Sequence, residues 1–360
     1  MEDVRLLKGN EAVALAAIRC GCDGYFGYPI TPQSEILETL AAERPWQTSG
    51  MVVLQAESEV AAINMVYGGA GCGKKVMTSS SSPGFSLKQE GMSYLAGAEL
   101  PCLVVNVVRG GPGLGTIQAS QADYFQSTKG GGHGDYKLLV LAPNSVQEMA
   151  DFTVLGFELA FKYRNPVLIL SDGIIGQMME RVVLPEVKPR LTDEEIAAKY
   201  SWATLGKPTS RERNIITSLE LKSESMEINN NRLQQKYKKM QDEEVRYEEY
   251  MTEDAEYVFV AFGSSARICK KAVEIARKEG IKAGLLRPIT LFPYPTLKIK
   301  ELATKVKGFL SVEMNAGQMV EDVKLAVEGA VPVEYYGRMG GIVPTPDEVV
   351  VALKEKIIKA

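Results

Sequence analysis

The sequence predicts an α/β protein in which helices cover both faces of mostly parallel sheets. Short apolar stretches with strand character alternate with helical patterns through the first 175 residues, and a second alternating unit begins near residue 257. The region between the two units is charged and interrupted by prolines. Strands that are separated by helices along the chain are typical of parallel sheets buried on both sides. We therefore expect two α/β domains joined by a linker.

Local signals place the elements of the first unit in order. Asn10 is suited to cap a helix, and Pro83 fits the first turn of another. The expected helices are 10–17, 34–42, 58–71, 83–98 and 145–163. The expected strands are 23–28, 51–55, 75–80, 101–108 and 166–170.

The remaining chain divides into a linker and a smaller domain. Prolines interrupt the start of 185–252, and apolar residues recur at helical spacing in its charged second half, which predicts a long and mostly solvated helix. Its charges are assigned no function. We expect a first domain over 1–184, the linker over 185–252 and a second domain over 253–360. Strands are expected at 257–261, 283–287, 309–313 and 331–335, with a last helix at 347–358.

Composition narrows the class of protein. Of the 360 residues, 45% are hydrophobic and 24% charged, which is typical of a globular domain. The formal net charge of −4 argues against nucleic acid as the main partner. No stretch approaches the roughly 20 apolar residues of a membrane helix, and the first residues lack the pattern of a signal peptide. A cytoplasmic protein is expected.

Cysteine usage excludes one kind of redox centre. The chain has five cysteines and no C-x-x-C pair. Iron–sulfur clusters need several closely spaced cysteine ligands. If the reaction moves electrons, we therefore expect them to leave through another polypeptide.

Two short runs carry most of the functional information. The first is Tyr28-Pro29-Ile30-Thr31-Pro32, in which two prolines make a stiff, extended corner after a strand. The second is Gln55-Ala56-Glu57-Ser58-Glu59, which brings carboxylates to the point where a strand gives way to a helix. Ligands bind open α/β sheets at such strand ends. Taken singly, the first run is typical of a turn and the second of an acidic first helical turn.

Three further segments are candidates for binding. Arg109 follows an apolar strand and opens the glycine-rich run 110–115, where an arginine can bind a carboxylate through two parallel hydrogen bonds. The polar run 78–84 suits a strand-to-helix turn that caps a helix or meets a ligand. His133, the only histidine, lies in a glycine-rich loop and is either a proton carrier near the site or an ordinary loop residue.

As a set, the segments around Thr31, Glu59 and Arg109 resemble the alpha subunits of 2-oxoacid:ferredoxin oxidoreductases. The resemblance extends over most of the chain and is closest to the 2-ketoisovalerate branch. It implies a parallel-sheet domain of the thiamine-diphosphate pyrimidine-binding type, followed by an α/β domain of the transketolase C-terminal type. The second domain carries the resemblance in Gly263-Ser264-Ser265, Leu286-Arg287-Pro288, residues 312–319 and Gly337-Arg338-Met339.

The resemblance also implies roles for individual residues. Thr31 and Arg109 would bind the 2-oxo acid, Arg109 at its carboxylate, and both would take part in catalysis. Pro29 and Ile30 would line the pyrimidine ring of thiamine diphosphate. Glu59 would be the catalytic carboxyl group on the pyrimidine nitrogen, because residue-by-residue matching selects it over Glu57.

The diphosphate half of the cofactor site is expected on another chain. Asp23-Gly24 and Asp172-Gly173 both lack the leading glycine of the Gly-Asp-Gly motif that accompanies magnesium-bound diphosphate, so no metal site is expected here. A beta subunit would carry the diphosphate and Mg2+ site. Gamma and ferredoxin-like delta subunits would complete the complex, and the [4Fe-4S] clusters would lie on partner subunits.

The implied reaction is the oxidative decarboxylation of 2-oxoisovalerate to its acyl-CoA, with loss of CO2 and transfer of electrons to ferredoxin. Two alternatives stay open at this point. The same chemistry could act on 2-oxoglutarate or pyruvate. The chain could instead be a non-catalytic assembly subunit whose motifs shape an interface.

Overall fold

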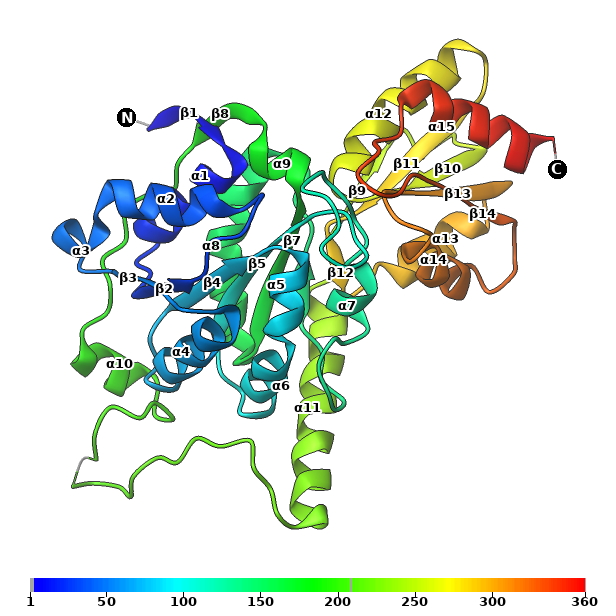
Figure 1. The fold of residues 1–360 in the computed structure, drawn as a ribbon. Coiled ribbons are helices and arrows are strands. Elements are labelled where there is room, and N and C mark those ends of the chain that lie inside the picture. The colour runs from blue at the N-terminus through cyan, green and yellow to red at the C-terminus, as the bar shows by residue number, and fades with distance from the viewer. Residues whose placement is uncertain (1–2, 208, 360) are drawn as a thin grey trace.

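The computed structural model describes residues 3–207 and 209–359, which form a larger N-terminal and a smaller C-terminal α/β domain (Figure 1). The strands are β1 Val4–Lys8, β2 Gly24–Gly27, β3 Val52–Gln55, β4 Val76–Ser80, β5 Cys102–Val108, β6 Leu139–Leu141, β7 Pro166–Asp172, β8 Met179–Val183, β9 Tyr247–Tyr250, β10 Tyr257–Val260, β11 Ala283–Pro288, β12 Thr290–Phe292, β13 Gly308–Glu313 and β14 Val333–Gly337. The α-helices are α1 Gly9–Arg19, α2 Ser34–Glu43, α3 Pro45–Thr48, α4 Glu59–Gly71, α5 Ser82–Leu87, α6 Gln89–Gly97, α7 Tyr124–Thr128, α8 Val146–Tyr163, α9 Gly173–Gln177, α10 Asp193–Lys199, α11 Ser223–Glu243, α12 Gly263–Lys278, α13 Thr296–Ala303, α14 Met319–Val327 and α15 Pro346–Leu353.

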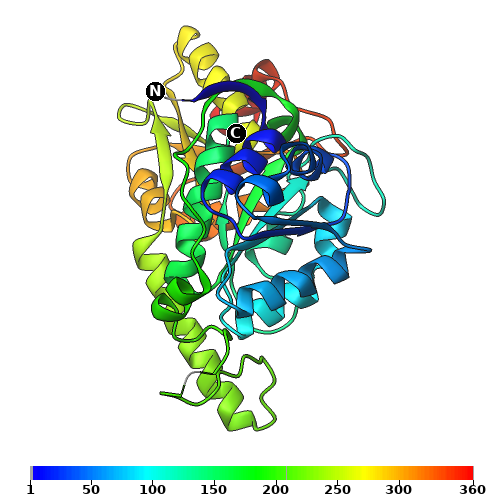
Figure 2. The same ribbon diagram turned by 90° about the vertical axis from the view of Figure 1, so that its left-hand side faces the viewer.

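The N-terminal domain is built on a sheet with the strand order β12-β6-β7-β5-β4-β2-β3. All neighbouring pairs are parallel except β12 with β6. Helices α1 and α8 cover one face, and α4, α5 and α6 cover the other (Figures 1 and 2). The expected parallel α/β fold is confirmed. A separate pair of antiparallel strands, β1 and β8, lies beside α1 and was not predicted.

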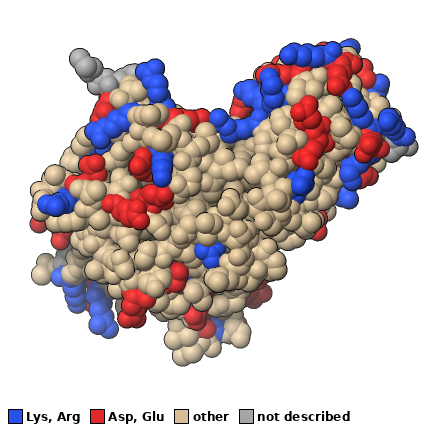
Figure 3. All heavy atoms as spheres, turned by 45° about the horizontal axis from the view of Figure 1, so that its top comes forward, with Lys and Arg blue, Asp and Glu red and all other residues tan. Residues whose placement is uncertain are grey.

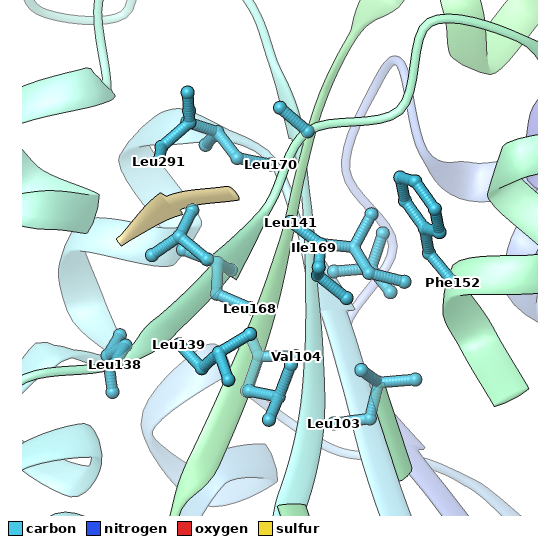
Figure 4. Packing of buried hydrophobic residues seen from close by; sticks show 14 of the residues in the cluster. Leu103, Val104, Leu138, Leu139, Leu141, Phe152, Leu168, Ile169, Leu170 and Leu291 are labelled. Atoms are coloured by element: carbon cyan, nitrogen blue, oxygen red, sulfur yellow. The ribbon is translucent and has the colours of Figure 1, made fainter. Parts of the chain in front are cut away.

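The core of this domain lies around the central strands. Every residue of β5 and β7 is buried, as expected for strands covered on both faces. Their side chains pack with those of β6 and α8 in a dense apolar layer (Figure 4). The near-continuous apolar character of 102–108 and 166–170 is what made these strands readable in the sequence.

The C-terminal domain has the strand order β14-β13-β10-β11-β9, with only β9 antiparallel to its neighbour. Helices α12 and α15 pack together on this sheet, as do α13 and α14. The helix α11, in the region expected to be a linker, extends below the N-terminal domain (Figure 1). The strand β9 falls inside the region 185–252 yet pairs with β11. The boundaries at 184 and 252 stay a prediction.

Three expected elements differ in detail. The helix expected over 83–98 is two helices that meet at Lys88, which ends α5 and precedes α6. The expected helix over 347–358 becomes a π-helix from Lys354 to Ile358 after α15. Asn10 does not cap α1, because that helix starts one residue earlier, after Lys8. Instead, the buried Asn10 amide donates to the carbonyl of Pro32.

The two domains are joined by buried hydrogen bonds around Gln121. Its side-chain amide donates to the carbonyl of Phe262 and accepts from the Ser265 hydroxyl, both at 2.8 Å. Its backbone amide donates to the carbonyl of Met314. Nearby, the buried Asp172 carboxylate caps α9 and accepts from the Ser264 hydroxyl at the start of α12. Burial raises the pKa of Asp172. These contacts hold the C-terminal domain against the end of β7.

Candidate functional site

Four adjacent parallel strands, β5, β4, β2 and β3, end at one edge of the N-terminal sheet. The segment that follows each strand there carries one of the predicted site features. Thr31 follows β2 and Glu59 follows β3. The polar run 78–84 begins in β4 and continues beyond it, and Arg109 follows β5 directly. Ligands bind open α/β sheets at this edge.

The corner at residues 28–32 is fixed from behind by side-chain amides. Asn10 and Gln177 both donate to the carbonyl of Pro32, at 2.7 and 2.9 Å. The Gln33 amide donates to the carbonyl of Tyr28 at 3.2 Å. The peptide bond between Thr31 and Pro32 is cis. Thr31 itself is exposed, so its hydroxyl is free to meet a ligand while its backbone is held.

The two candidate carboxylates differ sharply in burial. Glu57 is exposed, whereas Glu59 is only 7% exposed. Glu59 is the first residue of α4, and Ser58 caps that helix by accepting from the Ala61 amide at 3.2 Å. In the part of the chain that the structure describes, no protein group donates a hydrogen bond to the Glu59 carboxylate. The carboxylate is thus positioned by its helix, and its oxygens are available to a ligand.

Gly84 makes room for the Glu59 carboxylate. A side chain at position 84 would place its Cβ 2.5 Å from Oε1 of Glu59 and closer still to Oγ of Ser80. Only glycine therefore allows α5 to approach α4 this closely. Packing therefore explains why the polar run 78–84 ends in a glycine, which the sequence pattern did not reveal.

Arg109 is hydrogen-bonded to the corner that carries Thr31. Its Nη1 donates to the carbonyl of Thr31 at 3.0 Å, and its Nη2 donates to the carbonyl of Leu114 at 3.1 Å. The side chain is 7% exposed, and its Nε is buried without a protein partner within residues 3–207 and 209–359. The structure therefore brings Arg109 and the Thr31 corner together, and the Nε–H of Arg109 is left without a protein acceptor.

A buried network that was not predicted positions the backbone of Arg109. The Ser82 hydroxyl accepts from the Arg109 amide at 3.1 Å and donates to the Asp123 carboxylate at 2.8 Å. Asn106 donates to the same carboxylate and accepts from the Ser82 amide. Burial raises the pKa of Asp123, while the bonds from Asn106 and Ser82 oppose that rise. An Asn in an apolar strand was the available signal for this network.

The other two candidates are His133 and the polar run 78–84. The His133 ring packs edge-on against Tyr94 of α6, with centroids 5.9 Å apart, and its Nδ1 is 3.4 Å from the Ser93 hydroxyl. No contact between His133 and Thr31, Glu59 or Arg109 occurs among the described residues. The hydroxyls of Ser80 and Ser81, by contrast, are buried without partners in that same part of the chain.

Exposed apolar side chains lie next to several of these residues in the sequence. Tyr28, Val60 and Leu87 are neighbours in sequence of the Thr31 corner, of Glu59 and of the α5–α6 junction, and they are 36%, 45% and 56% exposed. Leu114, whose carbonyl Arg109 binds, is 83% exposed. Figure 3 shows a broad area with few charges between the charged rims of the two domains. None of the described helices is long and apolar enough to cross a bilayer.

Comparison with known families identifies the class of protein. Residues 15–252 match the family profile of pyruvate flavodoxin/ferredoxin oxidoreductase, thiamine-diphosphate-binding domain, and residues 255–349 match core domain II of pyruvate:ferredoxin oxidoreductase. The chain belongs to the pyruvate flavodoxin/ferredoxin oxidoreductase family.

Curated relatives place the chain within that family. It is 56% identical to the ketoisovalerate oxidoreductase subunit VorB of Methanothermobacter marburgensis, over 94% of this chain and 93% of the relative. It is 39% identical to the 2-oxoglutarate synthase subunit KorA of Methanocaldococcus jannaschii, over 96% and 98%. The chain is thus an alpha-type subunit of the 2-oxoacid:ferredoxin oxidoreductases on the ketoisovalerate branch, which confirms the resemblance read from the sequence.

A solved structure supports the fold and the enzyme class. The 2-oxoglutarate:ferredoxin oxidoreductase of Magnetococcus marinus, with 2-oxoglutarate, coenzyme A and succinyl-CoA bound, superposes with a TM-score of 0.84 at 28% identity. The match covers 99% of this chain and 66% of that chain. A split-gene transketolase, at 13% identity and a TM-score of 0.61, shares the fold.

Proposed function

We propose that this chain is the subunit through which a multi-subunit enzyme converts 2-oxoisovalerate and CoA to the branched-chain acyl-CoA and CO2, while two electrons pass to ferredoxin. The main support is the buried carboxylate of Glu59, which accepts no hydrogen bond from a described protein group. It lies at the same sheet edge as the Arg109–Thr31 pair. The greater identity to the ketoisovalerate subunit than to the 2-oxoglutarate subunits favours the branched-chain acid. 2-Oxoglutarate and pyruvate are the alternative substrates.

The residues at the sheet edge fit a thiamine diphosphate pyrimidine ring. Glu59 offers a carboxyl group with no protein donor among the described residues, and Gly84 leaves the room that this carboxyl group occupies. Pro29 and Ile30 lie between Tyr28 and Pro32, whose carbonyls accept hydrogen bonds from Gln33 and from Asn10 and Gln177. When bound, thiamine diphosphate supplies the carbanion chemistry, and the protein supplies position and electrostatics. Glu59 would hold or release a proton at the ring nitrogen.

Arg109 and Thr31 would orient the 2-oxo acid. The buried Nε of Arg109 lacks a protein partner in the described chain, so the guanidinium retains a donor for the substrate carboxylate. The exposed Thr31 hydroxyl lies on the corner whose carbonyl Arg109 binds. The Ser82–Asp123–Asn106 network keeps the arginine backbone in place.

Partner subunits would complete the site. A beta subunit with the Mg2+ and diphosphate site would cover the exposed apolar side chains beside Thr31 and Glu59. Gamma and ferredoxin-like delta subunits would carry the [4Fe-4S] clusters, because this sequence has no run of several closely spaced cysteines. A cytoplasmic location agrees with this assembly.

A matched pair of variants tests the role of Glu59. We expect Glu59→Gln in the assembled complex to lower turnover by about 100-fold or more, because general acid–base groups contribute roughly 10²- to 10⁴-fold. Glu57→Gln, a change of the same chemistry two residues away at an exposed position, should stay within a few-fold of wild type. Initial rates of CoA-dependent viologen reduction measure both.

Retained turnover in Glu59→Gln would contradict the assignment of Glu59. Loss of turnover in both variants would point to a shared structural effect, which thermal unfolding of the two complexes would reveal. The alternative of a non-catalytic assembly subunit predicts that neither substitution changes turnover in a complex that assembles normally.

A further inference from the structure

A cavity lies between Arg109 and the C-terminal domain. It has a volume of about 380 Å³, and the N-terminal domain lines it with Arg109, the glycine-rich loop that follows this arginine, and Asp123. The C-terminal domain contributes Asn315, Gln318 and Met339 to the opposite wall. Cavities of roughly 300–1,000 Å³ are typical of sites for small molecules. This cavity adjoins the arginine that the proposed function assigns to the substrate carboxylate.

The C-terminal domain is held close to the loop that follows Arg109. This loop, residues 110–118, runs beside the C-terminal domain (Figure 1). A side chain at position 341 would place its Cβ 2.4 Å from Cβ of Gln118, and φ of Gly341 is 90°. Only glycine therefore allows the two segments to approach this closely. Met339, two residues before Gly341, is 60% exposed and is brought to the wall of the cavity by this contact.

The polar side chains on the wall are engaged in hydrogen bonds within the protein. The side-chain amide groups of Asn315 and Gln318 each donate to one backbone carbonyl and accept from one backbone amide, at 2.8–2.9 Å. The Ser86 and Ser120 hydroxyls donate to backbone carbonyls at 3.1 Å. Arg109 differs from these residues. A guanidinium group has five N–H groups, and two of those of Arg109 have an acceptor in the described chain.

Charge on the wall is limited to one residue of each sign. Among the described residues that line the cavity, Arg109 and Asp123 alone are charged. The Asp123 carboxylate accepts from the Ser82 hydroxyl and the Asn106 amide, both at 2.8 Å. A ligand can therefore place one carboxylate against Arg109. A second carboxylate would find no cation on the wall, and burying an unpaired charge costs free energy.

Resting on the proposed function, we propose that this cavity takes the uncharged side chain of the 2-oxo acid and that Met339 is a specificity-determining residue on its wall. The isopropyl group of 2-oxoisovalerate would pack against Met339 while Arg109 binds the carboxylate. 2-Oxoglutarate is disfavoured, because its side chain ends in a second carboxylate that finds no partner here. The C-terminal domain thereby takes part in selecting the substrate.

Substitutions of Met339 in the assembled complex test this assignment. Met339→Lys adds a cation to the wall. We expect it to shift the ratio of kcat/KM for 2-oxoglutarate to that for 2-oxoisovalerate by about 10-fold or more in favour of 2-oxoglutarate, since single pocket contacts change kcat/KM by roughly 10- to 200-fold. Met339→Gln is polar but uncharged. It should raise the KM for 2-oxoisovalerate with kcat within a few-fold of wild type, because the contact lies away from the reacting carbon.

A second exposed apolar residue of the C-terminal domain provides the matched control. Leu325 in α14 is 70% exposed and is not among the residues that line the cavity. Leu325→Lys adds the same charge and should leave the kcat/KM ratio unchanged. Met339→Leu, which keeps an apolar side chain, should stay within a few-fold of wild type. Thermal unfolding of each complex confirms that the variants are folded.

The outcomes separate this proposal from the proposed function. An unchanged ratio in Met339→Lys, together with an unchanged KM in Met339→Gln, would overturn the role of Met339. Turnover of 2-oxoisovalerate by the wild-type complex would then still support the proposed function. Absence of turnover of any 2-oxo acid by an intact wild-type complex would overturn the proposed function and this proposal with it.

Discussion

Glu59 and Lys88 show how burial changes what a charged residue can do. Glu57 and Glu59 are the same type of residue two positions apart, yet only Glu59 is buried at the sheet edge. Lys88 looks like a surface residue in the sequence, where it precedes a glutamine and a glutamate. Its position at the α5–α6 junction turns it inward. Side-chain burial of this kind depends on the tertiary packing of α4, α5 and β4, which local sequence does not contain.

The buried charge of Lys88 should lower stability at neutral pH. Its pKa is about 8 in the folded chain and ordinarily 10.5, so the folded state binds fewer protons between these values. This group therefore makes the free energy of unfolding rise with pH over that window. At 1.36 kcal/mol per pKa unit, the cost below pH 8 is about 3 kcal/mol.

Lys88→Met should remove that cost. We expect its free energy of unfolding to exceed that of wild type by about 1–3 kcal/mol at pH 7, since part of the gain is lost with the hydrogen bond that Lys88 Nζ donates to Oγ1 of Thr78. The advantage should shrink above pH 8 and vanish near the ordinary lysine pKa. Urea unfolding of the full chain at several pH values measures it. A variant less stable than wild type at pH 7 would show that the ammonium group is net stabilising.

At the scale of elements, Glu313 explains why an acid ends a buried strand. Its carboxylate accepts from the backbone amides of Met319 and Val320 at the start of α14, and from the Ser311 hydroxyl. It thus satisfies amides that lack partners within the helix and lies at the positive end of the helix dipole. Glu313 falls within residues 312–319, one of the segments that carry the resemblance, and the sequence alone offers no mechanism for it.

Removal of this carboxylate should destabilise α14. We expect Glu313→Ala to lower the free energy of unfolding by about 3 kcal/mol, because several buried amides lose a charged acceptor. Glu321→Ala, at an exposed position in the first turn of the same helix, is the control and should change stability by less than about 0.5 kcal/mol. Urea unfolding followed by circular dichroism compares them. Equal stabilities of the two variants would contradict this account of Glu313.

The elements that the sequence predicted well are those with an unbroken pattern. Strands β5 and β7 and helix α8 were predicted to within about two residues at either end because their apolar patterns run without interruption. The short strands β6, β9 and β12 were missed. Each depends on a partner distant in sequence, as β12 does on β6 across about 150 residues. The break at Lys88 likewise follows from packing rather than from a local breaker residue.

At the scale of the whole molecule, the fold gathers the candidate site residues at one edge of the N-terminal sheet. The carboxyl ends of four parallel strands bring the Thr31 corner, Glu59 and Arg109 to one edge, and those residues were predicted from the sequence. Their supporting residues Asn106, Asp123 and Gln177 were not, because their roles depend on contacts between distant segments. The exposed apolar residues near this edge are the surface that we propose a partner subunit covers.

The most direct test of the proposed function is a substrate panel on the native complex. The chain would be co-purified anaerobically with its partners and assayed with CoA and a viologen dye. 2-Oxoisovalerate, 2-oxoglutarate, pyruvate and an aryl 2-oxo acid would be supplied separately. We expect CoA-dependent dye reduction, fastest with 2-oxoisovalerate. Faster turnover of another acid would overturn the substrate while keeping the reaction. No turnover of any acid, in a complex with intact clusters and bound thiamine diphosphate, would contradict the proposed function.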